Sequence, residues 1–185
     1  MIDQINSKIS AKDQKIVIVT ADFNHEITES LTDGAMDAFL HHDGSERDLT
    51  IIHVPGAFEI PSTVVQAINS LQPDAVVTLG AVIRGATPHF DFVAAEAARG
   101  ISELSKTYDI PIVFGVLTTN NLEQALERAG TKAMNKGWEV MESALKMLSI
   151  YQQISIRNSY QPTLHNSLTE KRKSLSIQET DAHNY

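Results

Sequence analysis

Residues 75–98 read AVVTLGAVIRGATPHFDFVAAEAA, and this stretch decides the fold. Its first five residues form an apolar run with the length and β-branching typical of a buried strand. The Gly-containing segment 80–89 predicts a loop, and residues 90–98 predict a helix that begins near His89. Because free N–H groups and the helix dipole favour negative charge at a helix start, this strand, loop and helix indicate an anion-binding turn.

The loop has a partial likeness to the phosphate-binding loop of nucleotide hydrolases. Gly80 and Gly85 have the motif's spacing and Thr87 follows, but Ala86 occupies the position where the motif requires Lys. The sequence therefore argues against ATP hydrolysis and leaves a smaller phosphorylated ligand open. An ordinary strand-to-helix turn, with His89 at the surface, is the alternative interpretation of this loop.

Composition narrows the class of protein. A chain of 185 residues, 42% of them hydrophobic, is long enough for one domain with a sizeable core. The net charge of −8 argues against general binding to nucleic acids or anionic membranes. The sequence has no cysteine, begins without the basic and apolar segments of a signal peptide, and lacks a run of about 20 apolar residues. We expect a cytoplasmic protein that binds neither membrane nor nucleic acid.

Charge is unevenly distributed along the chain. Residues 1–150 carry 20 acidic and 11 basic side chains, whereas residues 151–185 carry 3 and 4. Within the acidic part, Arg128, Lys132 and Lys136 recur every four residues and would share a face on a continuous helix. Cations gathered in this way favour an anionic ligand, and a solvated helix face is the alternative interpretation.

Strands and helices alternate four times. The expected strands are residues 15–20, 49–54, 75–79 and 110–117, and the expected helices are residues 27–40, 62–71, 90–108, 122–129 and 137–150. Asn24 and Thr28 are candidate caps of the first helix. The alternation predicts a single-domain α/β protein, a three-layer α/β/α sandwich with a four-stranded parallel sheet. Residues 1–14 predict an N-terminal arm, residues 15–150 the domain, and residues 151–185 the end of the last helix and a polar, partly disordered tail.

The segments that follow the four strands collect the unusual polar and aromatic residues. These segments are residues 21–26, 55–59, 80–89 and 118–121. The carboxyl ends of parallel strands meet at one edge of a sheet, where ligands bind in open α/β folds. Phe23, Phe58, Glu59, Arg84 and His89 would therefore gather at one rim, and this convergence predicts a small-molecule site.

No metal site is predicted. His41 and His42 with Asp43 supply suitable atoms, but adjacent side chains rarely converge on one ion. We interpret these three residues as a surface turn.

Five segments carry a more specific signal. They are FNHEIT at 23–28, VPGAFEIP at 54–61, GAVIRGATPHFD at 80–91, FGVLTT at 114–119 and EQALERAGTK at 123–132. In order and spacing, over about residues 15–150, they resemble the lumazine synthase (6,7-dimethyl-8-ribityllumazine synthase) family. The resemblance implies a flavodoxin-like fold whose sheet is extended by an N-terminal strand from a neighbouring subunit.

The resemblance also implies an activity. A transferase of this family catalyses the penultimate step of riboflavin biosynthesis, in which 5-amino-6-(D-ribitylamino)uracil condenses with 3,4-dihydroxy-2-butanone 4-phosphate to 6,7-dimethyl-8-ribityllumazine, inorganic phosphate and water. It uses no metal or organic cofactor. Family members are homopentamers or multiples of pentamers, and riboflavin synthase is a candidate partner. The alternative is a paralogue that binds flavin or lumazine, or forms a shell, without catalysis.

The same resemblance assigns roles to the site residues. Phe23 would stack on the pyrimidine, Ala57, Phe58 and Glu59 would hold the ribityl chain, and the backbone of Ala81, Val82 and Ile83 would face the heterocycle. Gly85, Ala86 and Thr87 would surround the phosphate, and His89 would transfer protons. Phe114 and the catalytic cations Arg128 and Lys136 would come from the neighbouring subunit, with Arg128 on the phosphate.

Two residues depart from the family pattern. Asp22 stands where a basic residue commonly precedes the Phe-Asn pair, and Met134 stands where a glycine is usual. The first lies beside the expected pyrimidine site and the second in the segment that leads to Lys136.

Overall fold

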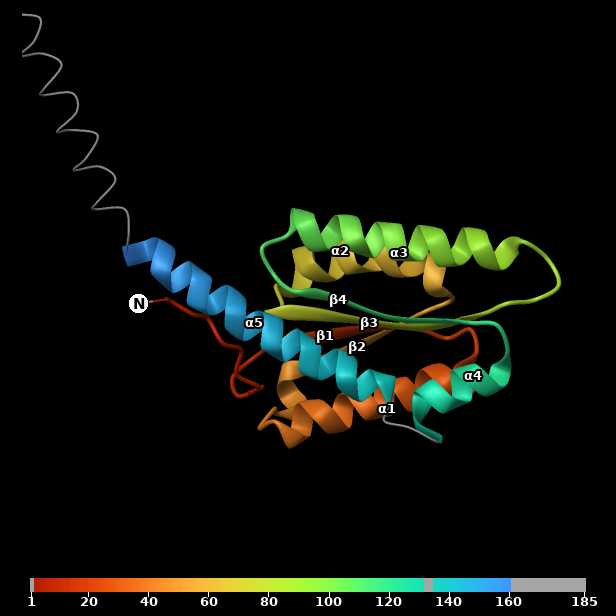
Figure 1. Cartoon of the computed structure of the whole chain (residues 1–185), viewed down its shortest axis with the longest axis horizontal. Helices are drawn as coiled ribbons and strands as arrows, with labels where there is room; N and C mark the ends of the chain where they lie inside the picture. The colour runs from red at the N-terminus through yellow and green to blue at the C-terminus, as the bar shows by residue number, and fades with distance from the viewer. Residues whose placement is uncertain (1, 132–134, 161–185) are drawn as a thin grey trace, which may run out of the picture. The chain divides into compact units, whose positions relative to one another are not determined.

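A computed structural model describes residues 2–131 and 135–160 (Figure 1). Its sheet contains four parallel strands in the order β2-β1-β3-β4, namely β1 (Ile16–Ala21), β2 (Leu49–Val54), β3 (Ala75–Ile83) and β4 (Ile112–Thr119). The two central strands, β1 and β3, are apolar and almost wholly buried, as parallel strands covered on both faces must be. The predicted α/β class and four-stranded parallel sheet are confirmed.

Helices cover both faces of this sheet. α2 (Ile60–Leu71) and α3 (His89–Thr107) lie on one face, and α1 (His25–His41), α4 (Leu122–Leu126) and α5 (Lys136–Tyr160) lie on the other (Figure 1). Successive side chains of β1 point to opposite faces, so that Ile16 and Ile18 join the core under α1 while Val17 and Val19 join the core under α2 and α3. This gives the three predicted layers. None of the described helices has an apolar stretch long enough to cross a membrane.

β3 is longer than the sequence predicts. Residues 80–83, which the local pattern places in the loop, continue the strand because they pair with residues 116–119 of β4. Thr118 and Thr119 likewise belong to β4 and not to a loop. A strand extends as far as its neighbour supplies hydrogen bonds, and the local pattern does not contain that information. The turn before α3 is therefore only residues 84–88.

The segment with the three spaced cations is not a continuous helix. α4 is followed by a π-helical turn, Glu127–Thr131, in which Gly130 has a φ of 114°. This left-handed conformation favours glycine and ends the helix, so the predicted interruption between residues 129 and 137 is confirmed and Arg128 and Lys136 do not share one helix face. Lys132 and Met134 lie outside the described residues.

α5 begins at Lys136 and continues to Tyr160, beyond the predicted end near residue 150. A boundary between two units of the chain follows Ile150, within this helix. The predicted polar tail from residue 161 onward lies outside the described residues.

The N-terminal arm, residues 2–14, forms no helix or strand in the described chain. Ala11 is fully buried and its N–H donates to the carbonyl of His42 at 2.7 Å. The N–H of Lys8 donates to Ser149 Oγ at 3.1 Å, so the arm packs against α1 and α5 of its own chain. An N-terminal strand supplied by a neighbouring subunit remains a prediction.

Candidate functional site

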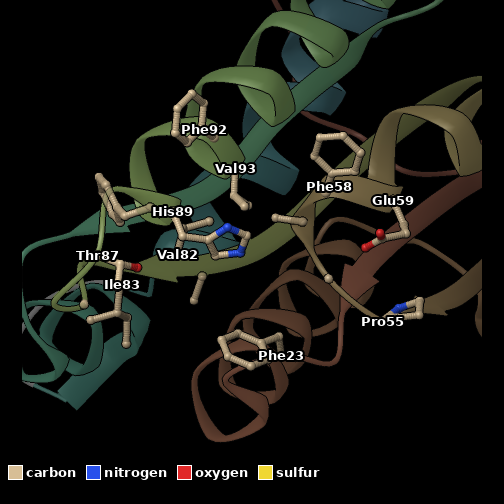
Figure 2. A pocket seen from close by; sticks show the side chains of 15 residues that line it. Phe23, Pro55, Phe58, Glu59, Val82, Ile83, Thr87, His89, Phe92 and Val93 are labelled. Carbon is tan, nitrogen blue, oxygen red and sulfur yellow. The ribbon is translucent and has the colours of Figure 1, made fainter.

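A cavity of about 660 Å³ opens beyond the carboxyl ends of β1, β2 and β3 (Figure 2). β2 and β3 lie on opposite sides of β1, so the chain reverses its direction of progress across the sheet at this point. Ligands of open α/β sheets bind at such a switch point. The lining residues are Phe23, Pro55, Gly56, Ala57, Phe58, Glu59, Ala81, Val82, Ile83, Gly85, Thr87, His89, Phe90, Phe92 and Val93.

Phe23 lies at the cavity mouth with 70% of its surface exposed, on a turn tied to both neighbouring strands. The N–H of Asp22 donates to the carbonyl of Val54 at 2.7 Å. Asn24 occupies the cap position of α1 with a φ of 63°, but its side-chain amide donates to the carbonyl of Ala81 at 2.8 Å and does not cap the helix. The prediction of Asn24 as the cap is therefore right in position but not in its side-chain bond, and the prediction of Thr28 is wrong, since its Oγ1 donates to the carbonyl of His25. The amide of Asn24 instead holds Phe23 in place against β3.

The side chain of Asp22, the acidic departure from the family pattern, is bound to β2 and not directed to the cavity. Its carboxylate accepts a hydrogen bond from His53 Nδ1 of the edge strand β2 at 3.0 Å. Both side chains are more than half exposed, and neither lines the cavity.

The short η2 helix (Ala57–Glu59) supplies the opposite wall. Ala57 is buried in the core, whereas Phe58 and Glu59 are exposed and line the cavity. The carbonyl of Glu59 accepts hydrogen bonds from Ser62 Oγ and Thr63 Oγ1, both at 3.0 Å, and these bonds fix the start of α2. The Glu59 carboxylate itself has no hydrogen-bond partner within the described part of the chain, so it is available to ligand hydroxyls.

The end of β3 and the start of α3 form the third wall. Residues Ala81, Val82 and Ile83 present the strand end, and the imidazole of His89 points into the cavity (Figure 2). Among the described residues, nothing accepts a hydrogen bond from the backbone N–H groups of Gly85, Ala86 and Thr87. Such unpaired donors beside the first turn of a helix favour an anion. Gly80, in contrast, is a strand residue and takes no part in this turn.

Four predicted site residues do not line this cavity: Ala86, Phe114, Arg128 and Lys136. Arg128 Nη1 donates to the carbonyl of Gln124 at 3.1 Å, and Lys136 forms an ion pair with Glu139. Phe114, on β4, is 41% exposed. One chain thus brings together the residues expected to bind the pyrimidine, to hold the ribityl chain and to transfer protons. The expected cations, Arg128 and Lys136, lie outside this cavity.

The cavity has five lining residues beyond the predicted set: Pro55, Gly56, Phe90, Phe92 and Val93. Phe92 and Val93 follow His89 by three and four residues on α3 and therefore lie on the same helix face. That spacing is the signal in the sequence that could have found them.

The electrostatics of the cavity are simple. Glu59 and His89 are the only titratable side chains that line it, and no lysine or arginine does so within the described residues. Arg84 stands next to the cavity but is bound to Asp91. No group of histidine and carboxylate side chains suited to a metal ion occurs in residues 2–131 and 135–160. The cavity offers aromatic surfaces, one carboxylate, one imidazole and unpaired backbone donors.

These features define an α/β enzyme that binds small organic substrates beyond the carboxyl ends of its parallel strands. The particular family follows from comparison with known sequences. The chain matches the family model of 6,7-dimethyl-8-ribityllumazine synthase over residues 13–152, and it belongs to this family.

Proteins with that name resemble this chain closely. The 6,7-dimethyl-8-ribityllumazine synthase of Campylobacter hominis is 55% identical over 141 residues, which is 76% of this chain and 90% of the relative. That of Campylobacter lari is 53% identical over 81% of this chain and 97% of the relative. That of Chloroherpeton thalassium is 49% identical over 83% of this chain and 99% of the relative.

Proposed function

We propose that this protein condenses 5-amino-6-(D-ribitylamino)uracil with 3,4-dihydroxy-2-butanone 4-phosphate to 6,7-dimethyl-8-ribityllumazine in riboflavin biosynthesis. Membership of the 6,7-dimethyl-8-ribityllumazine synthase family supports the reaction. The observation that carries the assignment to this site is the cavity in which Phe23, Glu59 and His89 converge beside unpaired backbone donors.

The pyrimidine side of the site is formed by Phe23 and η2. The exposed ring of Phe23 offers a face to a flat heterocycle, and the unpaired carboxylate of Glu59 accepts hydrogen bonds from the hydroxyls of the ribityl chain. Ala57 and Phe58 flank that chain, and the end of β3 at Ala81, Val82 and Ile83 borders the ring.

His89 serves proton transfer. The amine attacks the ketone to form an imine with loss of water, phosphate is eliminated, and the ring closes on the remaining carbonyl with loss of a second water. Each step moves a proton, and an imidazole is suited to that task near neutral pH. His89 points into the cavity and has no hydrogen-bond partner among the described residues, so it is free to meet the substrates. Holding both substrates together supplies a further share of the rate.

Phosphate binding requires a second subunit. The N–H groups of Gly85, Ala86 and Thr87 have no acceptor in the described chain, but the cavity of one chain contains no lysine or arginine among its described residues and is lined by Glu59. A phosphate dianion calls for a cation in such a place. We therefore assign Arg128 and Lys136 of a neighbouring subunit, with its Phe114, to complete the site in a homopentamer or a multiple of pentamers.

The cellular setting follows from the reaction. Both substrates are small, charged or polyhydroxylated metabolites, so we place the enzyme in the cytoplasm. Riboflavin synthase is the partner that would take up the lumazine. Neither assignment affects the roles of the site residues.

The test is a coupled measurement of turnover and mass. Purified protein is mixed with both substrates while lumazine absorbance is followed, and light scattering on the same sample reports the oligomer. We expect lumazine formation by a pentamer or larger assembly. An assembled protein that binds lumazine without forming it would replace this proposal with the non-catalytic binding or shell-forming paralogue.

A further inference from the structure

Arg84 is the first residue after β3, yet its side chain does not enter the cavity. Its Nη1 and Nη2 donate to the two carboxylate oxygens of Asp91 at 3.1 and 2.9 Å. Its Nε donates to Asn120 Oδ1 at 3.3 Å, and the guanidinium carbon lies 4.1 Å from the centre of the Phe90 ring. One side chain thus connects β3, the first turn of α3 and the loop after β4.

The turn between β3 and α3 needs such a connection. Its backbone hydrogen bonds lie at its two ends, where the N–H of Arg84 donates to the carbonyl of Thr119 at 2.9 Å and the N–H of Asp91 donates to the carbonyl of Pro88 at 3.0 Å. Between these bonds, residues 85–87 have no acceptor within the described chain. Unpaired backbone donors bind an anion well only if their positions are held beforehand by other contacts.

The geometry of Arg84 suits this purpose. A single exposed ion pair contributes little, and Arg84 and Asp91 are 44% and 56% exposed. The two-pronged pairing of a guanidinium with a carboxylate is directional, however, and here a third hydrogen bond and a ring contact are added. Lysine could reproduce the charge but not this fork.

We infer that Arg84 is a positioning residue for the phosphate turn. With Asp91 it holds residues 85–87, and with Phe90 it holds the first turn of α3 that carries His89. This inference rests on the proposed function, because it takes residues 85–87 as the phosphate site. It differs from a direct role, in which the guanidinium would leave Asp91 and bind the phosphate itself.

Four variants of the full-length protein separate these roles: Arg84→Ala, Arg84→Lys, Asp91→Asn and the double variant Arg84→Ala/Asp91→Asn. Arg99→Ala is the matched control, because Arg99 is an exposed arginine on α3 that pairs with Glu96 and Glu103 and does not line the cavity. The readouts are KM for each substrate, kcat, the Kd of inorganic phosphate by calorimetry, and Tm as a check of folding.

If Arg84 and Asp91 together position the phosphate turn, a substitution of either residue should cause the same defect. Arg84→Ala, Arg84→Lys and Asp91→Asn each raise KM for the butanone phosphate and the Kd of inorganic phosphate about tenfold, the loss expected for a charged hydrogen-bond pair. KM for the ribitylaminouracil stays within about twofold, since Phe23 and Glu59 are untouched. The double variant is no worse than either single variant, because both remove one interaction. Arg99→Ala behaves like the wild type.

Three results would overturn the inference. Wild-type phosphate binding in Asp91→Asn, or near wild-type values in Arg84→Lys, would indicate that Arg84 binds phosphate directly. An equal rise of both KM values would indicate a general loss of structure. A fourth result does not overturn it: absence of turnover in the wild type, with the phosphate Kd still dependent on Arg84 and Asp91, would reject the proposed reaction and leave the positioning role supported.

Discussion

Two regions of the molecule differ in whether their polar groups are hydrogen-bonded within the chain. In the cavity, the Glu59 carboxylate and the His89 imidazole have no hydrogen-bond partner among the described residues, and Phe23, Phe58 and Phe92 expose most of their rings. On the other face of the sheet, where α1 meets α5, the side-chain amide of Asn135 is fully hydrogen-bonded within the chain. Gly34 and Gly137 are buried there.

Asn135 makes that junction. Its amide nitrogen donates to the carbonyls of Ser30 and Ala129 at 2.7 and 2.8 Å, and its amide oxygen accepts from the N–H of Gly137 at 2.7 Å. It thereby connects α1, the π-helical turn and the start of α5. Polar groups that are satisfied inside the chain stabilise the fold, whereas polar groups left unsatisfied at a cavity are available to a ligand.

Gly137→Ala is expected to have the largest effect. A Cβ at Gly137 would collide with the backbone carbonyl of Leu31 on α1, and a backbone atom has no rotamer with which to move away. We expect a loss of more than about 3 kcal/mol in the free energy of unfolding, or no folded protein. Gly85→Ala is the matched variant in the cavity turn, where a Cβ would meet nothing within 4 Å.

Urea denaturation of both variants measures the contrast. Gly85→Ala should unfold at the wild-type urea concentration. A folded Gly137→Ala protein of wild-type stability would show that the two helices can separate, and the comparison between the regions would then fail.

His89→Ala is expected to have the next largest effect, and on a different quantity. Removal of a proton-transfer group lowers kcat by about a hundredfold, while Tm stays near the wild-type value because the His89 imidazole bonds to nothing in the described chain. Stopped-flow absorbance measures kcat, and thermal unfolding measures Tm. His25→Ala, which changes an exposed histidine that does not line the cavity, is the control. A large fall in Tm with little change in kcat would assign His89 to stability.

Asn135→Ala should reduce stability by about 2 to 3 kcal/mol, because it leaves the carbonyls of Ser30 and Ala129 and the N–H of Gly137 without their partner. Chemical denaturation measures the loss.

The Asn24→Ala variant gives a further test, since Asn24 makes one side-chain bond, to the carbonyl of Ala81. Its smaller expected loss, about 1 kcal/mol, should be accompanied by weaker pyrimidine binding, because Phe23 lies next to it.

The smallest expected effect is a pH dependence of stability that arises from the carboxyl of Glu142, further along α5. Burial raises the pKa of this carboxyl, but hydrogen bonds from Trp138 and His42 and the charge of Lys146 outweigh burial and lower it below the ordinary 4.5. A lowered pKa in the folded state stabilises the protein above the ordinary value, and this stabilisation is lost as the pH falls through the folded-state pKa.

Glu142→Gln should therefore lower stability by about 1 kcal/mol at pH 7, and the difference from the wild type should shrink below pH 4.5. Thermal unfolding from pH 7 to pH 3 measures it, with the exposed Glu46→Gln as control. A difference that grows toward acid pH would contradict the sign of the shift.

Much of the site could be predicted from the sequence. Strand and helix periods are local, and parallel strands bring their carboxyl ends to one edge, so the residue pattern alone places Phe23, Glu59 and His89 at one rim. The motifs around them also indicate the family that residues 13–152 match.

Other features depended on contacts between distant residues. The local pattern ends β3 at residue 79, whereas pairing with β4 carries it to Ile83 and removes Gly80 from the turn. The spacing of Arg128 and Lys136 would place them on one face only of a continuous helix, and the interruption predicted from the sequence is found at the left-handed Gly130. The error in β3 arises because the hydrogen-bond partners of a strand lie elsewhere in the sequence and do not follow from its local residue pattern.

Arg84 shows the distinction most clearly. By sequence alone it is a cation in a predicted anion-binding loop, with nothing in the residue pattern to show what it pairs with. Only the tertiary structure turns the first helical turn of α3 so that Asp91 lies within 3.1 Å of the guanidinium, which directs that charge to a carboxylate of the same chain. Sequence determines which charges are present, and the packing of distant elements determines which of them remain available to a substrate.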